Sequence, residues 1–152
     1  MNYLLDSNTI SDFYDKDSAN YPKILNKIAH LKNTDNVAIS ILTLYELEYG
    51  LANAPDNKKA VIEQKIIEVQ ADFAVFPLSK KGAKVFGGFK KAIRDNKMLN
   101  KENIKKHNID LMIAATAVVE NCVLVSADTI FPEIVNIDAR LKLENWIVVV
   151  NK

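Results

Sequence analysis

Apolar residues in this chain occur in two patterns, short uninterrupted runs and longer stretches in which they recur every three or four positions. The short runs predict β-strands, and the longer stretches predict helices with one buried face. The predicted strands are residues 3–5, 37–39, 73–78, 122–125 and 146–150. Because these runs are continuously apolar, they favour a parallel sheet that is covered on both faces.

Helical spacing fills most of the sequence between the strands. Helices are expected after Asp6, at 22–31, from Ser40 or Thr43 to about 54, at 57–72, from Ser79 onward, and at 109–119 with Asn108 as the capping residue. Gly82, Gly87 and Gly88 lower the helix propensity after Ser79, so a bend is expected there. Residues 97–106 are expected to form a loop.

The alternation of strands and helices predicts a three-layer α/β/α sandwich with a central, mainly parallel sheet. At 152 residues, the chain suits one domain, 1–152, with one main core. It has no run near the ~18 apolar residues of a membrane span and no signal-peptide pattern at its start, which favours a cytoplasmic protein. The single cysteine, Cys122, lies in an apolar run and is expected to be buried.

The net charge of +1 conceals an uneven distribution. Residues 79–107, called here the basic segment, hold ten Lys or Arg against two acids, a local net charge of +8, so the rest of the chain carries −7. Such a division is typical of a protein that binds a polyanion with one face and cations with another. A solvated helix face is the simpler explanation, and charge alone does not decide between them.

Four carboxylates stand at the ends of predicted elements. Asp6 and Asp128 directly follow apolar strands, and Glu46 and Asp110 lie in the first turns of helices. In an open parallel sheet, sites form at the carboxyl ends of the strands, where the following helices also begin. The four acids are therefore expected to gather at one edge of the sheet.

Four ionised carboxylates in one place repel one another unless a cation neutralises them. Oxygen ligands without His or Cys favour Mg²⁺ or Mn²⁺ over Zn²⁺. Such an ion activates water for in-line attack on phosphorus, so hydrolysis of a nucleic-acid backbone is the reaction that this pattern favours.

Each acid also has a purely structural explanation. Asp6 is a suitable helix cap, and Asp128 is a suitable turn residue before Pro132. Glu46 and Asp110 would stabilise helix N-termini through the helix dipole. Only the joint placement of the four acids favours a site.

The chain resembles the PIN-domain family, and more narrowly the VapC-type toxins of bacterial toxin–antitoxin modules, over nearly its whole length. Four ordered motifs and a closing segment carry the resemblance: 3–11 (YLLDSNTIS), 39–50 (ISILTLYELEYG), 108–117 (NIDLMIAATA), 124–128 (LVSAD) and 143–146 (LENW). Their acidic positions are Asp6, Glu46, Asp110 and Asp128. The resemblance makes these four the expected metal ligands and catalytic residues.

The fourth motif departs from the family's commonest pattern. Many members have Asn where this chain has Asp128, followed by a further acid that is missing from residues 129–131. Asp128 is therefore assigned the fourth position, and a contribution from Glu133 is left open. Ser126 is expected to support the site through its hydroxyl, and Asn8 to orient Asp6 or a water.

The resemblance implies a Mg²⁺- or Mn²⁺-dependent endoribonuclease that acts as a toxin. It also implies a VapB-like antitoxin as partner, an RNA substrate and a homodimer. The basic segment would then grip RNA phosphates.

Two other functions stay open from the sequence. The segment from Asp6 to Thr9 is similar to the start of haloacid-dehalogenase-like phosphatases, although Asn8 stands where they carry a second Asp. Alternatively, the basic segment belongs to a module that binds RNA without cleaving it.

The remaining conspicuous side chains are expected to be structural. Phe86 and Phe89 have the helical spacing of core residues, and Tyr45 and Tyr49 are expected in the core or in a dimer interface. Neither histidine, His30 nor His107, has a ligand-like spacing to the acids, so neither is expected to have a chemical role.

Overall fold

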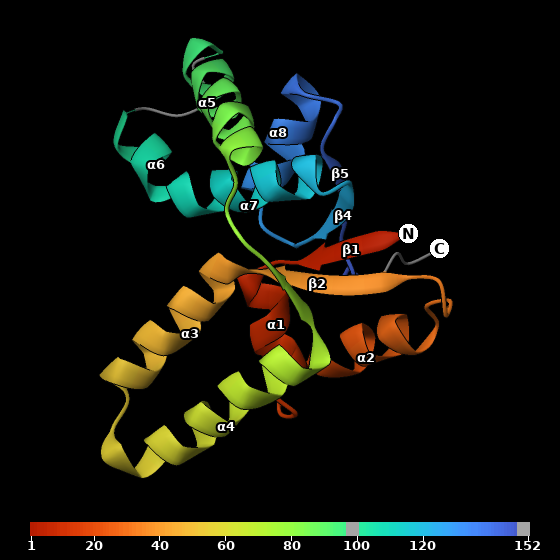
Figure 1. Ribbon diagram of the computed structural model, residues 1–152, viewed down its shortest axis with the longest axis vertical. Helices are drawn as coiled ribbons and strands as arrows, with labels where there is room; N and C mark the ends of the chain where they lie inside the picture. Colours follow the sequence, from red (N-terminus) through yellow and green to blue (C-terminus); the bar gives the residue numbers. More distant parts are fainter. Residues whose placement is uncertain (97–100, 149–152) are drawn as a thin grey trace.

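The computed structural model describes residues 1–96 and 101–148, with the side chains of 101 and 102 left undescribed. A parallel sheet crosses the middle of the molecule, and helices cover both of its faces (Figure 1). The predicted three-layer α/β/α sandwich is thereby confirmed.

The sheet is built outward from β1 in both directions. Its strands are β1 (Asn2–Leu5), β2 (Asn36–Ser40), β3 (Ala74–Phe76), β4 (Cys122–Val125) and β5 (Lys142–Glu144). They lie in the order β3-β2-β1-β4-β5, and every neighbouring pair is parallel. The chain fills one side of β1 first and then crosses to the other, so strand order reverses between β1 and β4. This is the edge position at which open α/β sheets form their sites.

The helices form two layers that follow the order of the chain. One face of the sheet is covered by α1 (Ser7–Phe13), α2 (Tyr21–Ala29), α3 (Ile41–Asn53) and α4 (Asp56–Asp72). The other face is covered by α5 (Lys80–Asp95), α6 (Lys101–Lys106), α7 (Asn108–Val119) and α8 (Ile130–Ile137) (Figure 1).

Alternate residues of the central strands feed two separate cores. Leu4 and Leu124 belong to the core beneath α5, α7 and α8, whereas their neighbours Leu5 and Val125 belong to the core beneath α1, α2 and α4. Successive side chains of a strand point to opposite faces, which is why a fully apolar run is needed here. The prediction of a sheet buried on both faces is confirmed.

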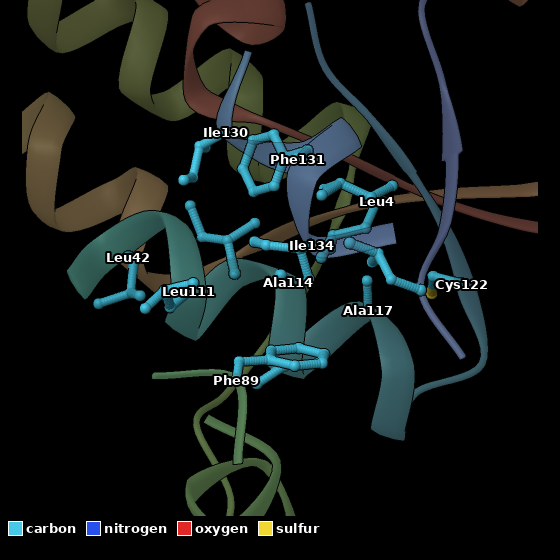
Figure 2. Close-up of a cluster of buried hydrophobic side chains, with 14 of the residues drawn as sticks. Leu4, Leu42, Phe89, Leu111, Ala114, Ala117, Cys122, Ile130, Phe131 and Ile134 are labelled. Atoms are coloured by element: carbon cyan, nitrogen blue, oxygen red, sulfur yellow. The ribbon is translucent and has the colours of Figure 1, made fainter. Parts of the chain in front are cut away.

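The alanines of α7 allow this helix to lie close to its neighbours. Ala114, Ala115 and Ala117 are all 1 % exposed or less. Figure 2 shows the ring of Phe89 from α5 beside α7, in the same cluster as Phe131 of α8. Phe89 is a core residue, as expected, and Cys122 is also buried in this cluster.

Two serines begin helices as the sequence predicts. The Ser40 hydroxyl accepts the Leu42 N–H at 3.1 Å, and the Ser79 hydroxyl accepts the Gly82 N–H at 3.0 Å. A Cβ at Gly82 would lie 3.2 Å from the Ser79 hydroxyl, so glycine keeps this cap open. The glycines of α5 do not interrupt the helix, which runs continuously from Lys80 to Asp95.

Several local predictions are wrong. The expected loop at 97–106 contains α6, in which Ile104 is buried, while 97–100 lie outside the described residues. Asn108 does not cap α7, because it lies inside the helix and His107 takes the cap position. Neither α8 nor β5 was predicted.

The predicted strand at 146–150 is also wrong over 146–148, and 149–150 lie outside the described residues. The last strand is β5, and Trp146 follows it as a core residue that is 4 % exposed. Its ring packs against Tyr3 with ring centroids 5.4 Å apart. The apolar run therefore reflects burial and not strand pairing.

Within the described ranges, no helix is both long and apolar enough to cross a membrane.

The two-core arrangement predicts how much stability is lost when one buried side chain is truncated. Leu124→Ala is expected to lower the free energy of unfolding by about 2–5 kcal/mol, because Leu124 is fully buried beneath α7 and α8. Urea denaturation followed by circular dichroism measures this change. Leu78→Ala is the control, since Leu78 is 51 % exposed and its truncation is expected to change stability by less than about 0.5 kcal/mol. Equal effects of both substitutions would contradict the assigned core.

Candidate active site

Asp6 lies where the sheet reverses its strand order. Its backbone N–H donates to Val125 O at 3.0 Å, which extends the β1–β4 pairing to the base of the carboxylate. Its Oδ1 accepts the Ser7 N–H at 2.9 Å, so Asp6 is also the N-cap of α1. The structural explanation for Asp6 is therefore correct as far as it goes. It accounts for one carboxylate oxygen only.

The second oxygen of Asp6 is held by Ser126, the residue that directly follows β4. The Ser126 hydroxyl donates to Asp6 Oδ2 at 2.8 Å, and both residues are 3 % exposed. The same hydroxyl accepts the Asp128 N–H at 3.0 Å. Ser126 thus fixes the orientation of Asp6 and the backbone of Asp128 at once.

Asp128 and Asp110 approach this point from two different segments, the loop between β4 and α8 and the first turn of α7. Asp128 Oδ1 accepts the Ile130 N–H at 3.3 Å at the start of α8. Asp110 lies in the first turn of α7, where its Oδ2 contacts His107 Nδ1 at 2.9 Å. Both carboxylates are partly exposed, which leaves them open to a ligand.

Asp6, Asp110 and Asp128 form one electrostatic group, called here the acidic trio. Burial raises the pKa of Asp6 to about 6, hydrogen bonds from Ser126 and Ser7 oppose that rise, and the charges of Asp110 and Asp128 add to it. Burial and the charge of Asp128 likewise raise the pKa of Asp110, against the lowering effect of His107. The pKa values of Asp6 and Asp110 are therefore raised in part by neighbouring carboxylates, as happens when carboxylates share a site.

Glu46 joins the trio through a hydroxyl. It lies exposed on α3, and the Ser7 hydroxyl donates to its Oε1 at 2.9 Å. Ser7 Oγ is also 3.0 Å from the Thr43 hydroxyl, and because its own proton is used on Glu46, Thr43 is the donor in that pair. Glu46 is not among the charges that raise the pKa of Asp6 or Asp110. It stands at the rim of the site.

Asn8, which was expected to support the site, and Glu133, whose contribution was left open, make no contact with the trio among the described interactions. Asn8 is exposed, and within the described residues no hydrogen bond joins it to Asp6. Glu133 is exposed on α8 and is not among the charges acting on the trio. Ser126, by contrast, makes the hydrogen bond expected of it.

Three residues at the site were missed by the sequence reasoning. His107 was assigned no chemical role, yet it contacts Asp110, and its i, i+3 spacing to that residue was the available signal. Ser7 and Thr43 were regarded only as capping residues. The hydrogen bond from Ser7 to Glu46 spans 39 positions of the sequence, and the one between Thr43 and Ser7 spans 36. No local pattern announces contacts of that range.

Tyr45 and Tyr49 correct another expectation. They are 69 % and 71 % exposed on α3, so they are not core residues. Their predicted place in a dimer interface stays a prediction.

The donor set fits a hard divalent cation in its chemistry. The trio offers only oxygen ligands, and two of its carboxylates, Asp110 and Asp128, place negative charge near the buried Asp6. Within the described part of the chain, no three His, Cys, Asp or Glu side chains are arranged to share one metal ion. Mg²⁺ needs only one or two direct carboxylates beside its waters, which two members of the trio can supply.

Comparison with protein families shows to which family this chain belongs. The PIN domain model matches residues 3–136, from β1 into α8, and so includes all four predicted acids. The chain belongs to the PIN-domain family. No curated protein sequence matches it. PIN domains are generally nucleases that use divalent metal ions, a description that suits the acidic trio.

Several solved structures share this fold, and VapBC complexes are among them. VapBC2 from Rickettsia felis, bound to a DNA fragment from its promoter, has a chain 26 % identical to this one, with a TM-score of 0.74 over 96 % of this chain and 99 % of that one. VapBC-1 from nontypeable Haemophilus influenzae shares 19 % identity, with a TM-score of 0.76 over 96 % and 98 %. FitAcB from Neisseria gonorrhoeae shares 20 %, with a TM-score of 0.75 over 94 % and 96 %.

The last two neighbours show the fold of this PIN domain alone. The family match and VapBC2, at 26 % identity, confirm the resemblance to VapC-type PIN proteins that the ordered motifs indicated.

The raised pKa of Asp6 makes a prediction for stability. A carboxyl whose pKa is higher in the folded than in the unfolded state contributes stability that is fully present below about pH 3.8 and is lost as pH rises through about 6. The difference corresponds to about 3 kcal/mol. In metal-free buffer, Asp6→Asn is therefore expected to unfold at higher urea than the wild type at pH 8, and at similar urea at pH 3.5.

The exposed Asp17 supplies the control, since Asp17→Asn changes an acid at the protein surface. The account fails if Asp6→Asn is less stable than the wild type at pH 8 while remaining folded.

Proposed function

We propose that this PIN domain is the toxin of a VapBC-type module, an endoribonuclease that hydrolyses RNA phosphodiester bonds with Mg²⁺ or Mn²⁺. Asp6, Asp110, Asp128 and Glu46 are the proposed catalytic acids and metal ligands. Membership of a family of nucleases supports the reaction class. The ribonuclease activity and the choice of metal are the added inference.

One observation carries the proposal, the buried carboxylate of Asp6 beside two other acids. A protein that needed Asp6 only as a helix cap would gain nothing from placing Asp110 and Asp128 where they oppose its ionisation. A divalent cation reverses that repulsion, and when bound it supplies an activated water and charge neutralisation at the phosphate.

The chain's own residues prepare the site in three ways. Ser126 and Ser7 hold both oxygens of Asp6, so its ligand geometry is fixed before any ion arrives. Desolvation keeps Asp6 in a low-dielectric position, where its attraction to a cation is stronger than in water. Glu46, exposed and oriented by Ser7, is placed to accept a proton or hold a water at the rim.

The phosphatase alternative receives no support from these observations. Phosphatases of that family carry a second Asp two residues after the first, and this chain has Asn8 there. Asn8 is exposed, and among the described residues it makes no hydrogen bond to Asp6. The binding-only alternative is separated from the proposal by a cleavage assay.

Substitution of the acids tests the chemistry. Asp6→Asn and Asp110→Asn are expected to lower the rate of metal-dependent cleavage of a labelled RNA by more than about 100-fold, and Ser126→Ala by about 10- to 100-fold, because Ser126 acts through Asp6. Chelation of the metal is expected to stop cleavage by the wild type. Mn²⁺ and Mg²⁺ are tested in parallel with Zn²⁺.

Glu133→Gln is the matched control, an exposed acid on α8 whose loss is expected to leave the rate within about twofold. Cleavage that persists in Asp6→Asn, or in the presence of excess chelator, would rule out the proposed mechanism.

The proposed partner is a VapB-like antitoxin. The 26 % identical neighbour was solved as a VapBC complex over almost the same length of chain, which supports the same assembly here. A homodimer is proposed with it, and the exposed Tyr45 and Tyr49 on α3 are surfaces available for such contacts.

Growth of a bacterial host tests the biological role. Induced expression of this chain is expected to arrest growth, and co-expression of the short reading frame beside its gene is expected to restore it and to co-purify as a complex. Asp6→Asn is expected to be harmless while still binding the partner. Normal growth during wild-type expression, with soluble protein present, would contradict a toxin role.

A further inference from the structure

A second feature, of opposite charge to the acidic trio, lies close to it along the chain. A cavity of about 360 Å³ opens between α5 and α6, called here the α5–α6 pocket. It is lined by Gly87, Lys90, Lys91, Arg94, Ile104 and Lys105. Among the described side chains no acid lines it, and its lining includes the buried Ile104. Four cationic side chains therefore surround a recess with an apolar base.

The sequence of α5 places its share of these residues on one face. Positions 87, 90, 91 and 94 follow the i, i+3, i+4, i+7 spacing of a helix surface. This face adjoins the buried stripe of Phe89 and Ile93, so it borders the core instead of pointing freely into solvent. A Cβ at Gly87 would meet no atom within 4 Å, which agrees with the open space in front of it.

The positive charge of the pocket is only partly neutralised. Asp95 pairs with Lys91 and, at 3.5 Å, with Arg94. Lys90 lies 5.8 Å from the centre of the Phe86 ring, and among the described side chains no carboxylate lies within 4.0 Å of Lys90 or Lys105. Among the described side chains, four cations line the recess and one carboxylate, Asp95, pairs with two of them. A recess with this excess of positive charge attracts an anion.

The pocket and the acidic trio are joined by a few residues of backbone. The His107 N–H donates to Ile104 O at 3.1 Å, and the Leu111 N–H donates to His107 O at 2.9 Å, so α6 passes into α7 in one continuous turn. Lys105 and Asp110 are five positions apart, a span of at most about 18 Å. A polyanion that occupies the pocket therefore reaches the trio within a few nucleotides.

We propose that the α5–α6 pocket binds the backbone phosphates of the RNA strand on one side of the bond that the acidic trio cleaves. This inference rests on the proposed function for its ligand and deepens it by assigning a substrate-holding site. The trio repels a polyanion until a cation neutralises it, whereas the pocket attracts the same strand without a metal. Lys90 and Lys105 provide the contacts because Asp95 does not neutralise them.

The salt dependence of RNA binding tests the pocket without using cleavage. The affinity of a fluorescein-labelled 12-nucleotide single-stranded RNA is measured by anisotropy, in EDTA, over a range of NaCl concentrations. Each phosphate contact contributes about 0.7 to the slope of log affinity against log salt. The double substitution of Lys90→Gln and Lys105→Gln is expected to reduce the slope by about 1.4, and Lys105→Gln alone by about 0.7.

The matched control removes the same charge from the opposite helix layer. Lys27→Gln with Lys58→Gln changes two exposed lysines on α2 and α4 and is expected to leave the slope within about 0.3 of the wild type. The double substitution of Lys90→Arg and Lys105→Arg, which keeps the charge, is expected to retain most of the slope. An unchanged slope in Lys105→Gln, an exposed position that leaves folding intact, would overturn the pocket. So would an equal loss in the control pair.

Failure of the proposed function gives a different pattern from failure of the pocket. If the chain binds RNA but never cleaves it, the slope changes still appear and the pocket stands as an RNA-binding site. If the chain cleaves RNA while the slopes stay unchanged, the ribonuclease stands and the pocket is wrong.

Discussion

The structure depends on one unfavourable arrangement, an acid buried at the point where the sheet reverses. Asp6 follows the central strand β1 directly, so its carboxylate is withdrawn from water by the same core that stabilises the fold. Ser126, which directly follows β4, and the N-terminus of α1 hold both of its oxygens, yet its pKa remains near 6. A neighbourhood that holds a carboxylate in place but disfavours its charge is prepared for a cation.

The topology explains how the other acids reach this point. The order β3-β2-β1-β4-β5 brings the carboxyl ends of β1 and β4 together, so Asp6 and Asp128 become neighbours although 122 positions separate them. The helices α3 and α7 begin at the same edge and bring Glu46 and Asp110 toward it. The α5–α6 pocket is lined in part by α6, which leads directly into α7. The cations of the pocket attract a polyanion, whereas the carboxylates of the acidic trio repel it.

The sequence allowed the sheet, its covering helices and the edge that carries the acids to be predicted, but not the long-range hydrogen bonds between side chains. Continuous apolar runs such as Cys122–Val125 report a strand buried on both faces, and acids that follow such runs must emerge at one edge. The exchange of hydrogen bonds between Ser7, Thr43 and Glu46 depends on how α1 and α3 pack, which no local pattern encodes. Trp146 misled the strand prediction because burial in a loop and burial in a strand leave the same apolar signature.

The central claim is that Asp6 is kept ionisable for a divalent cation, and its own titration tests that claim most directly. The ¹³C signal of the Asp6 carboxyl, followed by NMR from pH 3 to pH 8, is predicted to titrate near pH 6 in EDTA. In saturating Mg²⁺ the midpoint is predicted to fall below the ordinary value of 3.8 for an aspartate, because the ion stabilises the charged form. A midpoint that is the same with and without Mg²⁺ and Mn²⁺ would contradict the account.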